Sequence, residues 1–206
     1  MTSLKPTKIV CVGRNYAKHA AELGNEVPSE PLIFLKPPSS IIAEGEAIVM
    51  PAGAGRVDFE GEVGVIMGRT TRNVSRGDAW SHVEALVPVN DVTARDLQNT
   101  DDQWTRAKGF DSFCPVGTPV PLGDVDLDAL GVTTRVNGEV VQDAPVSDMA
   151  FDIPAIIAYI SGIMTLEAGD LVLTGTPDGI GPLSAGDEVE ISVAGVGTVT
   201  NPVVKG

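Results

Sequence analysis

The chain has 206 residues, of which 43% are hydrophobic and 20% charged, a composition typical of globular proteins and unlike that of disordered chains. Its 28 acidic residues outnumber its 14 basic residues and give a formal net charge of −14, so its surface would repel the phosphates of a nucleic-acid partner. No apolar run approaches the roughly 20 residues that span a bilayer, and the N-terminal apolar stretch is too short for a signal peptide, so we expect a cytoplasmic protein without a membrane partner.

The hydrophobic pattern predicts many short strands and few helices. The expected strands lie, in chain order, at residues 8–12, 32–35, 57–67, 86–89, 132–136, 139–142, 171–173, 188–193 and 198–204. The expected helical segments lie at residues 15–23, 77–85, 93–98 and after Asp152. Because strands dominate and do not alternate regularly with helices, the pattern favours an α+β fold that is mostly β, a roll or sandwich, over a doubly wound sheet.

Two of these elements carry specific local signals. The Asn137–Gly138 pair stands between two strand runs, and both residues accept positive φ, so it predicts a tight hairpin. Asp152 precedes a segment with Pro154 in its first turn, the pattern of a capped helix. An isoleucine stripe from Ile156 to Ile160 would form the buried face of that helix.

A glycine-rich stretch at residues 51–57 divides the chain into two parts. Residues 1–55 are predicted to form an N-terminal arm packed on the core, and residues 56–206 are predicted to form the main β region. No linker or low-complexity tract separates the two parts, so we expect one structural domain overall.

The most specific chemical feature is the acidic run from Asp58 to Glu62. In a strand, Glu60 and Glu62 project from the same face with Cα atoms about 6.5–7 Å apart, so both carboxylates could reach one ion. Gly61 between them would let another group approach the backbone closely. Oxygen ligands select a hard cation, namely Mg²⁺, Mn²⁺ or Ca²⁺. The alternative is a solvated acidic edge on a very acidic protein.

Such a site needs a third carboxylate. Asp91 is the best candidate, because it stands at the exit of the apolar run at residues 86–89, where functional side chains are common. Asp58, which shares the strand parity of Glu60 and Glu62, is the reserve candidate. Three protein ligands would leave coordination positions open for a substrate or water.

Three further features suggest chemistry. His19 and Glu22 are three residues apart on a short helix, so the carboxylate could orient the imidazole as a base; the alternative is an incidental surface pair. Lys108 could stabilise a developing anion, or be an ordinary surface lysine. Residues 174–177 could offer hydroxyl and backbone N–H groups to a substrate carboxylate, or form a plain turn.

Six motifs, taken in their order, resemble those of the fumarylacetoacetate hydrolase family. They are CVGRNYAKH (11–19), PLIFLKP (31–37), FEGEVG (59–64), NDVTARDLQ (90–98), WTRAKGFD (104–111) and GDLVLTGTP (169–177). The resemblance extends from about Lys8 to Val204 and is closest to the short single-domain branch of acylpyruvases and oxaloacetate decarboxylases. It implies the family's mixed β-roll with a few short helices, a homodimer, and Mg²⁺ or Mn²⁺ as the metal.

The resemblance also implies roles for particular residues. The implied metal ligands are Glu60, Glu62 and Asp91. The implied catalytic residues are His19, Glu22 and Lys108, the first two in a segment that closes as a lid over substrate. The implied substrate-binding residues are Arg14, Arg95, Gln98 and Thr176.

The expected activity is metal-dependent hydrolysis of a C–C bond in a 3-acylpyruvate-type 2,4-dioxo acid, giving pyruvate or a related product and a carboxylic acid. His19 would activate the attacking water, and Lys108 with Gln98 would stabilise the oxyanion. The alternatives are an oxaloacetate decarboxylase, or an isomerase or tautomerase of 2-hydroxy-dienoate acids such as 2-hydroxyhepta-2,4-diene-1,7-dioate. All take a small 2-oxo acid as the partner. A metal-binding module without catalysis would not need the His19–Glu22 pair or Lys108.

Overall fold

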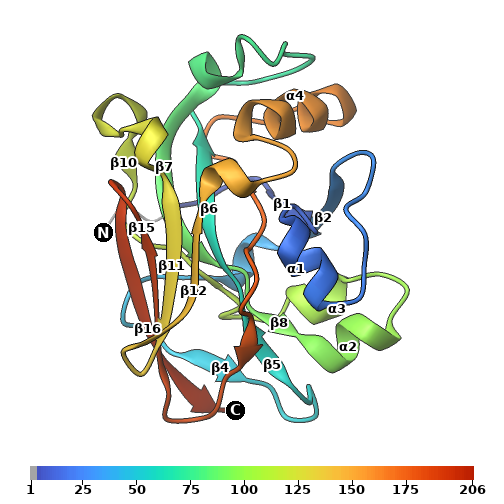
Figure 1. The fold of residues 1–206 in the computed structure, drawn as a ribbon, viewed down its shortest axis with the longest axis vertical. Coiled ribbons are helices and arrows are strands. Elements are labelled where there is room, and N and C mark those ends of the chain that lie inside the picture. The colour runs from blue at the N-terminus through green and yellow to red at the C-terminus, as the bar shows by residue number, and fades with distance from the viewer. Residues whose placement is uncertain (1–3) are drawn as a thin grey trace.

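The structure is a computed structural model that describes residues 4–206 (Figure 1). Two sheets form most of it. The first has six strands in the order β10 (Val120–Pro121), β7 (Val83–Asn90), β6 (Gly61–Met67), β13 (Leu171–Leu173), β1 (Ile9–Gly13) and β2 (Leu32–Lys36). The second has five strands in the order β12 (Glu139–Pro145), β11 (Gly131–Val136), β15 (Glu188–Val193), β16 (Gly197–Lys205) and β4 (Ile48–Met50). The mostly-β roll expected from the sequence is therefore confirmed.

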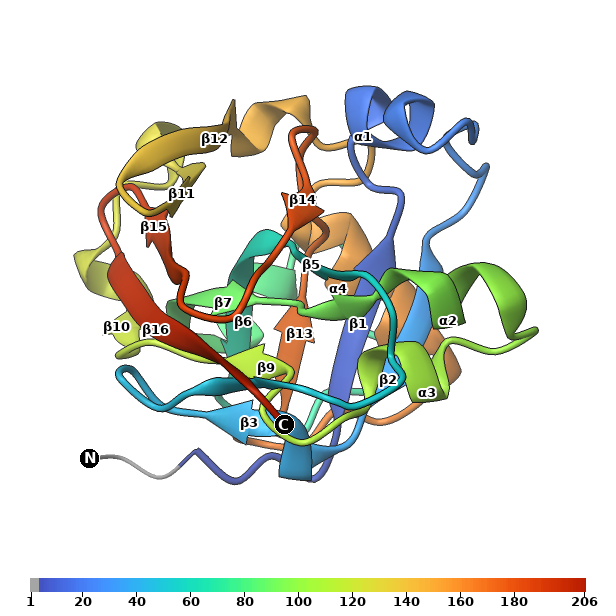
Figure 2. The same ribbon diagram turned by 90° about the horizontal axis from the view of Figure 1, so that it is seen from below.

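Smaller elements complete the fold. A three-stranded sheet has the order β14 (Gly181–Pro182), β5 (Val57–Phe59) and β8 (Thr93–Ala94), and β3 (Ile41–Ile42) pairs with β9 (Cys114–Pro115). The helices are α1 (Ala17–Glu22), α2 (Arg95–Thr100), α3 (Thr105–Lys108) and α4 (Ile153–Ile163). In Figures 1 and 2, α1, α2 and α3 gather on one side of the molecule, opposite the sheet formed by β11, β12, β15 and β16.

β6 is buried along its whole length, on both faces of the six-stranded sheet, so its residues show no clean alternation of apolar and polar side chains. Val63 and Val65 of β6 join the main core with α4 and the inner face of the five-stranded sheet. Ile66, on the opposite face, packs with Cys11 and Cys114 in a second cluster. Within the described residues, no helix is long and apolar enough to cross a bilayer.

The residues of the predicted N-terminal arm contribute β1 and β2 to the six-stranded sheet. β1 pairs in parallel with β13, which comes from the last quarter of the chain, and in antiparallel fashion with β2. This pairing places the segment that follows β1, including α1, beside the ends of β6 and β13. The boundary at residue 55 stays a prediction.

The two specific local signals are confirmed. Asn137 and Gly138 have φ values of 52° and 84° and connect β11 to β12. Asp152 accepts a hydrogen bond from the backbone N–H of Ala155 at 2.9 Å and caps α4, whose predicted isoleucine stripe is buried.

Two expectations need correction. The helix predicted at residues 77–85 is wrong: Ala79–His82 form a short 3₁₀ turn, and β7 begins at Val83, because pairing with β6 outweighs local helical preference. The single strand predicted at residues 57–67 is interrupted at Glu60, which separates β5 from β6 in different sheets. At this break the Glu60 N–H donates to the side-chain oxygen of Asn90, the last residue of β7, at 2.9 Å rather than to a backbone carbonyl.

Candidate active site

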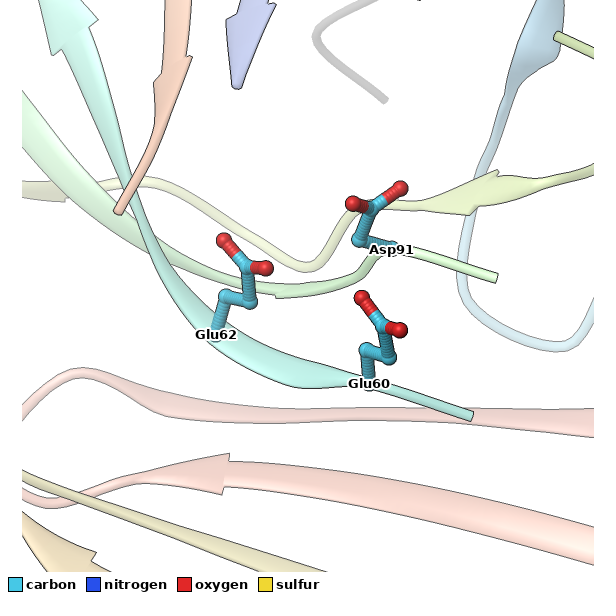
Figure 3. Close-up of side chains that lie close together, drawn as sticks. All are labelled: Glu60, Glu62 and Asp91. Carbon is cyan, nitrogen blue, oxygen red and sulfur yellow. The ribbon is translucent and has the colours of Figure 1, made fainter. Parts of the chain in front are cut away.

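Three buried carboxylates converge beside the C-terminal end of β7. Glu60 immediately precedes β6, Glu62 lies on it, and Asp91 immediately follows β7, whose Asn90 is paired with Gly61. One oxygen from each carboxylate lies within 4.8 Å of the other two (Figure 3). The side chains are buried, so a solvated acidic edge does not describe them. The expected convergence of Glu60, Glu62 and Asp91 is therefore observed.

Lys108 and Arg95 are two of the cations that border this carboxylate cluster. Lys108 Nζ donates to Glu60 Oε2 and to Asp91 Oδ2, both at 2.7 Å, and Arg95 Nη2 donates to Glu60 Oε1 at 2.5 Å. Burial alone would raise the pKa of Glu60, but the charges of Lys108 and Arg95 outweigh it and hold the pKa well below its usual range. Burial would lower the pKa of Lys108, but Asp91 and Glu60 raise it, so the ammonium stays protonated.

Glu62 lies in a different environment. Its carboxylate accepts a hydrogen bond from the backbone N–H of Gly175 at 2.7 Å, and no ion pair to it is found in residues 4–206. Burial and then the charges of Asp91 and Glu60 raise the pKa of Glu62 well above its ordinary value. A buried carboxylate that faces two others and lacks a cationic partner fits a site for a hard divalent cation, since oxygen donors suit such ions.

Lys36 is a neighbour of the carboxylate cluster that the sequence interpretation missed. It ends β2, is 1% exposed, and donates to Asp91 Oδ1 at 2.6 Å and to the Val92 carbonyl at 3.2 Å. The only sequence signal was a lysine ending an otherwise apolar strand. Asp58, our reserve ligand, is not part of the carboxylate cluster, because it pairs with Arg56 and Arg95.

The His19–Glu22 pair forms on α1, as the three-residue spacing predicts. His19 Nδ1 lies 3.4 Å from Glu22 Oε2, and Glu22 also accepts from the Gly179 N–H at 3.2 Å and 3.3 Å. His19 is buried, so the alternative of an incidental surface pair does not hold. Burial lowers the pKa of His19, while Glu60 and Glu22 partly oppose this, so the imidazole is neutral at pH 7 and able to act as a base.

One cavity of about 560 Å³ brings these groups together. It is lined by every residue that the sequence placed in the site: Arg14, His19, Glu22, Glu60, Glu62, Asp91, Arg95, Gln98, Lys108 and Thr176. It is also lined by side chains that the sequence did not point to: Leu23, Asn25, Phe34, Arg56, Asn99 and Trp104. The roles assigned to the ten predicted residues stay proposals.

The predicted substrate-binding residues differ in how many of their polar groups already have a partner within the protein. Arg95 is held by Asp58 and Glu60 and donates to the Gln98 side chain. The Thr176 hydroxyl donates to the Gly61 carbonyl at 2.9 Å. The Arg14 guanidinium instead lies 5.9 Å from the centre of the Trp104 ring, and no carboxylate of the described residues forms an ion pair with it. Arg14 is therefore the cation most available to a bound anion.

The chain is similar to known proteins in both sequence and structure. Residues 8–204 match the model of the fumarylacetoacetate (FAA) hydrolase C-terminal family. The chain is 44% identical over 202 residues to a Homo sapiens protein named oxaloacetate tautomerase FAHD1, mitochondrial, covering 96% of this chain and 91% of that protein. It is 42% identical over 197 residues to a Dictyostelium discoideum protein named oxaloacetate decarboxylase, mitochondrial, covering 93% and 90% of the two chains. A crystal structure of 2-hydroxyhepta-2,4-diene-1,7-dioate isomerase from Mycobacterium marinum superposes with a TM-score of 0.89 at 47% identity, covering 97% of this chain and 75% of that chain.

Proposed function

The chain belongs to the fumarylacetoacetate hydrolase family, and we propose that it is a metal-dependent tautomerase of short 2-oxo dicarboxylic acids, with oxaloacetate as the substrate. The observation that carries this proposal is the meeting of a buried three-carboxylate cluster and a His–Glu pair in one cavity. The names of the relatives support proton-transfer chemistry over hydrolysis. Hydrolysis of a 3-acylpyruvate C–C bond stays a prediction.

Glu60, Glu62 and Asp91 would hold the cation, for which Mg²⁺ and Mn²⁺ suit the oxygen donors. When bound, that ion would polarise the carboxylate and keto oxygens of a 2-oxo acid and so acidify its C3 protons. Lys108, which is protonated and borders Glu60 and Asp91, would stabilise the negative charge that develops on the keto oxygen.

His19 would move the proton in this scheme. Glu22 lies next to Nδ1, which leaves Nε2 as the nitrogen able to take a proton from C3 of the substrate. The same nitrogen could return the proton to the enolate oxygen, which completes the exchange between keto and enol forms. Burial of His19 lowers its pKa and keeps the imidazole neutral, as a base requires.

Arg14 would bind the second carboxylate of the substrate. The metal site accounts for the carboxylate next to the keto group, and a dicarboxylic acid carries another anion at its far end. Arg14 lines the same cavity and has no ion-pair partner in residues 4–206, so it offers a charge-assisted hydrogen bond to that anion.

Oxaloacetate decarboxylation is a second candidate, favoured by the name of the Dictyostelium relative. It would use the same cluster and the same enolate, but CO₂ rather than a proton leaves C3, so a base is not needed. The two reactions are distinguished by their products, because only decarboxylation forms pyruvate.

The test is to mix the purified chain with oxaloacetate and Mg²⁺ or Mn²⁺, and to follow the enol absorbance and pyruvate in parallel. We expect faster keto–enol exchange without matching pyruvate release, and loss of the effect with a chelator or in Glu60→Ala. The exposed Glu44→Gln is the charge control and should retain activity. Unchanged exchange in the presence of the enzyme would refute the proposal, and pyruvate release at the rate of enol loss would favour decarboxylation.

A further inference from the structure

Gln142 is a buried amide in an otherwise exposed part of an edge strand. It lies on β12, where the residues before it, Glu139 to Val141, are exposed, yet Gln142 itself is only 1% exposed. Its oxygen accepts hydrogen bonds from the Gly61 N–H at 3.0 Å and from Thr134 Oγ1 at 2.7 Å. Its nitrogen donates to Thr176 Oγ1 at 2.9 Å and to the Pro177 carbonyl at 2.8 Å. All four hydrogen-bonding positions of the amide are therefore used.

These bonds close a ring around Gly61. Thr176 Oγ1, which accepts from Gln142, donates in turn to the Gly61 carbonyl at 2.9 Å. Gly61 is thus held through its N–H by Gln142 and through its carbonyl by Thr176. Because these two groups belong to the peptide planes on either side of Gly61, the ring fixes the backbone between Glu60 and Glu62, and so the direction of both carboxylates.

We call Gln142, Thr134 and Thr176 the clamp. Atoms of the clamp leave no room for a side chain at Gly61. A Cβ atom there would lie 2.2 Å from Thr134 Oγ1 and 3.3 Å from Gln142 Oε1. The sequence led us to expect that Gly61 admits a close approach to the backbone. The groups that approach are side chains of the neighbouring β11–β12 hairpin.

We infer that Gln142 is a positioning residue that sets the separation of the Glu60 and Glu62 carboxylates and thereby the affinity of the site for its divalent cation. Gln142 is not among the residues that line the cavity, so it acts through the backbone of Gly61 and not by contact with substrate. The clamp uses two acceptor positions and two N–H donors at the end of one side chain, and an amide is the side-chain group that offers both pairs. The inference rests on the metal site of the proposed function.

The test is to measure Mn²⁺ binding to the full chain by calorimetry, without substrate. Loss of an outer-shell partner typically weakens metal binding about 10–100-fold, and we expect that range for Gln142→Leu. The matched control is Asn201→Leu on β16. Asn201 is also 1% exposed, and its amide donates to the Ala43 and Glu46 carbonyls, both at 2.8 Å, while none of the three lines the cavity. This control should lower the melting temperature and leave the Mn²⁺ Kd unchanged.

A second variant covers the case in which Gln142→Leu does not fold. Thr134→Val is nearly isosteric and removes only the 2.7 Å bond to Gln142, so we expect a smaller weakening of Mn²⁺ binding in the same direction. A positioning role also predicts that excess Mn²⁺ restores kcat and KM of the folded variants toward wild type. A wild-type Kd in folded Gln142→Leu, or in Thr134→Val if only that variant folds, would overturn the inference.

The proposed function and this inference can fail separately. If the wild-type chain binds Mn²⁺ and the variants weaken it, but no 2-oxo acid is converted, the clamp stands and the proposed reaction fails. If the wild-type chain does not bind Mn²⁺, both are overturned.

Discussion

Lys36 Nζ and Asp91 Oδ1 form a 2.6 Å ion pair whose two side chains are 0% and 1% exposed. Asp91 therefore contacts two lysines: Lys36, which does not line the cavity, and Lys108, which does. An ion pair removed from water in this way is costly to break, because the remaining charge keeps its desolvation penalty.

Substitution of Lys36 by Met should therefore destabilise the fold. Removing one partner of a buried pair typically costs about 3–5 kcal/mol, and we expect a loss in the free energy of unfolding at the lower end of that range. Urea unfolding followed by circular dichroism measures it. The control is Lys5→Met at an exposed position, which should change stability by less than about 0.5 kcal/mol. A similarly small change for Lys36→Met would show that Asp91 does not depend on this partner.

His19→Ala should slow keto–enol exchange much more than decarboxylation of oxaloacetate. A positioned base contributes about 10²–10⁴-fold, and only proton transfer at C3 requires one. The two rates can be measured on one substrate as enol loss and pyruvate formation. His82→Ala is a suitable control, because His82 bonds to Thr71 at 2.8 Å outside the cavity. Equal losses of both activities in His19→Ala would argue against a role as base.

Arg14→Gln should change substrate preference. A hydrogen bond to a charged group contributes about 1.5–3 kcal/mol, so we expect KM for oxaloacetate to rise roughly 10–100-fold. For acetylpyruvate, which has one carboxylate, KM should change little. The exposed Arg69→Gln controls for the loss of a positive charge from this acidic protein. Equal increases in KM for oxaloacetate and acetylpyruvate would show that Arg14 does not bind the second carboxylate of the substrate.

Asp170 should make stability depend on pH at the acidic end. Burial would raise the pKa of Asp170, but hydrogen bonds from the backbone of Glu167 and from Thr7 and Lys8 lower it below 3.8. Because the pKa of Asp170 is lower in the folded chain, its stabilising effect is complete at a pH above its pKa in the unfolded chain. The effect is lost as the pH falls through its pKa in the folded chain. The wild-type chain should lose unfolding free energy below about pH 4 more steeply than Asp170→Asn. Urea titrations across this range measure both slopes, and equal slopes would contradict the assignment.

Several parts of the site and of the fold followed from local sequence patterns. Glu60 and Glu62 are two residues apart, and the alternation of side chains in an extended chain places both on one face whatever surrounds them. His19 and Glu22 meet for the equivalent reason on a helix. The turn at Asn137–Gly138 depends only on the φ values that its own residues accept. Each of these relationships spans a few residues.

The other relationships join distant parts of the chain. Lys36 and Asp91 are 55 residues apart, and Gln142 and Gly61 are 81 residues apart. The helix expected at residues 77–85 was wrong for a related reason, since pairing of β7 with β6 decided the conformation from Val83 onward. The sequence by itself determined the family, the mostly-β architecture and which acidic and basic side chains line one cavity, because short-range geometry and residue chemistry are readable from the order of residues. Only the tertiary structure decided how those groups are held and charged, because burial, ion pairing and hydrogen-bond partners depend on which strands pack together.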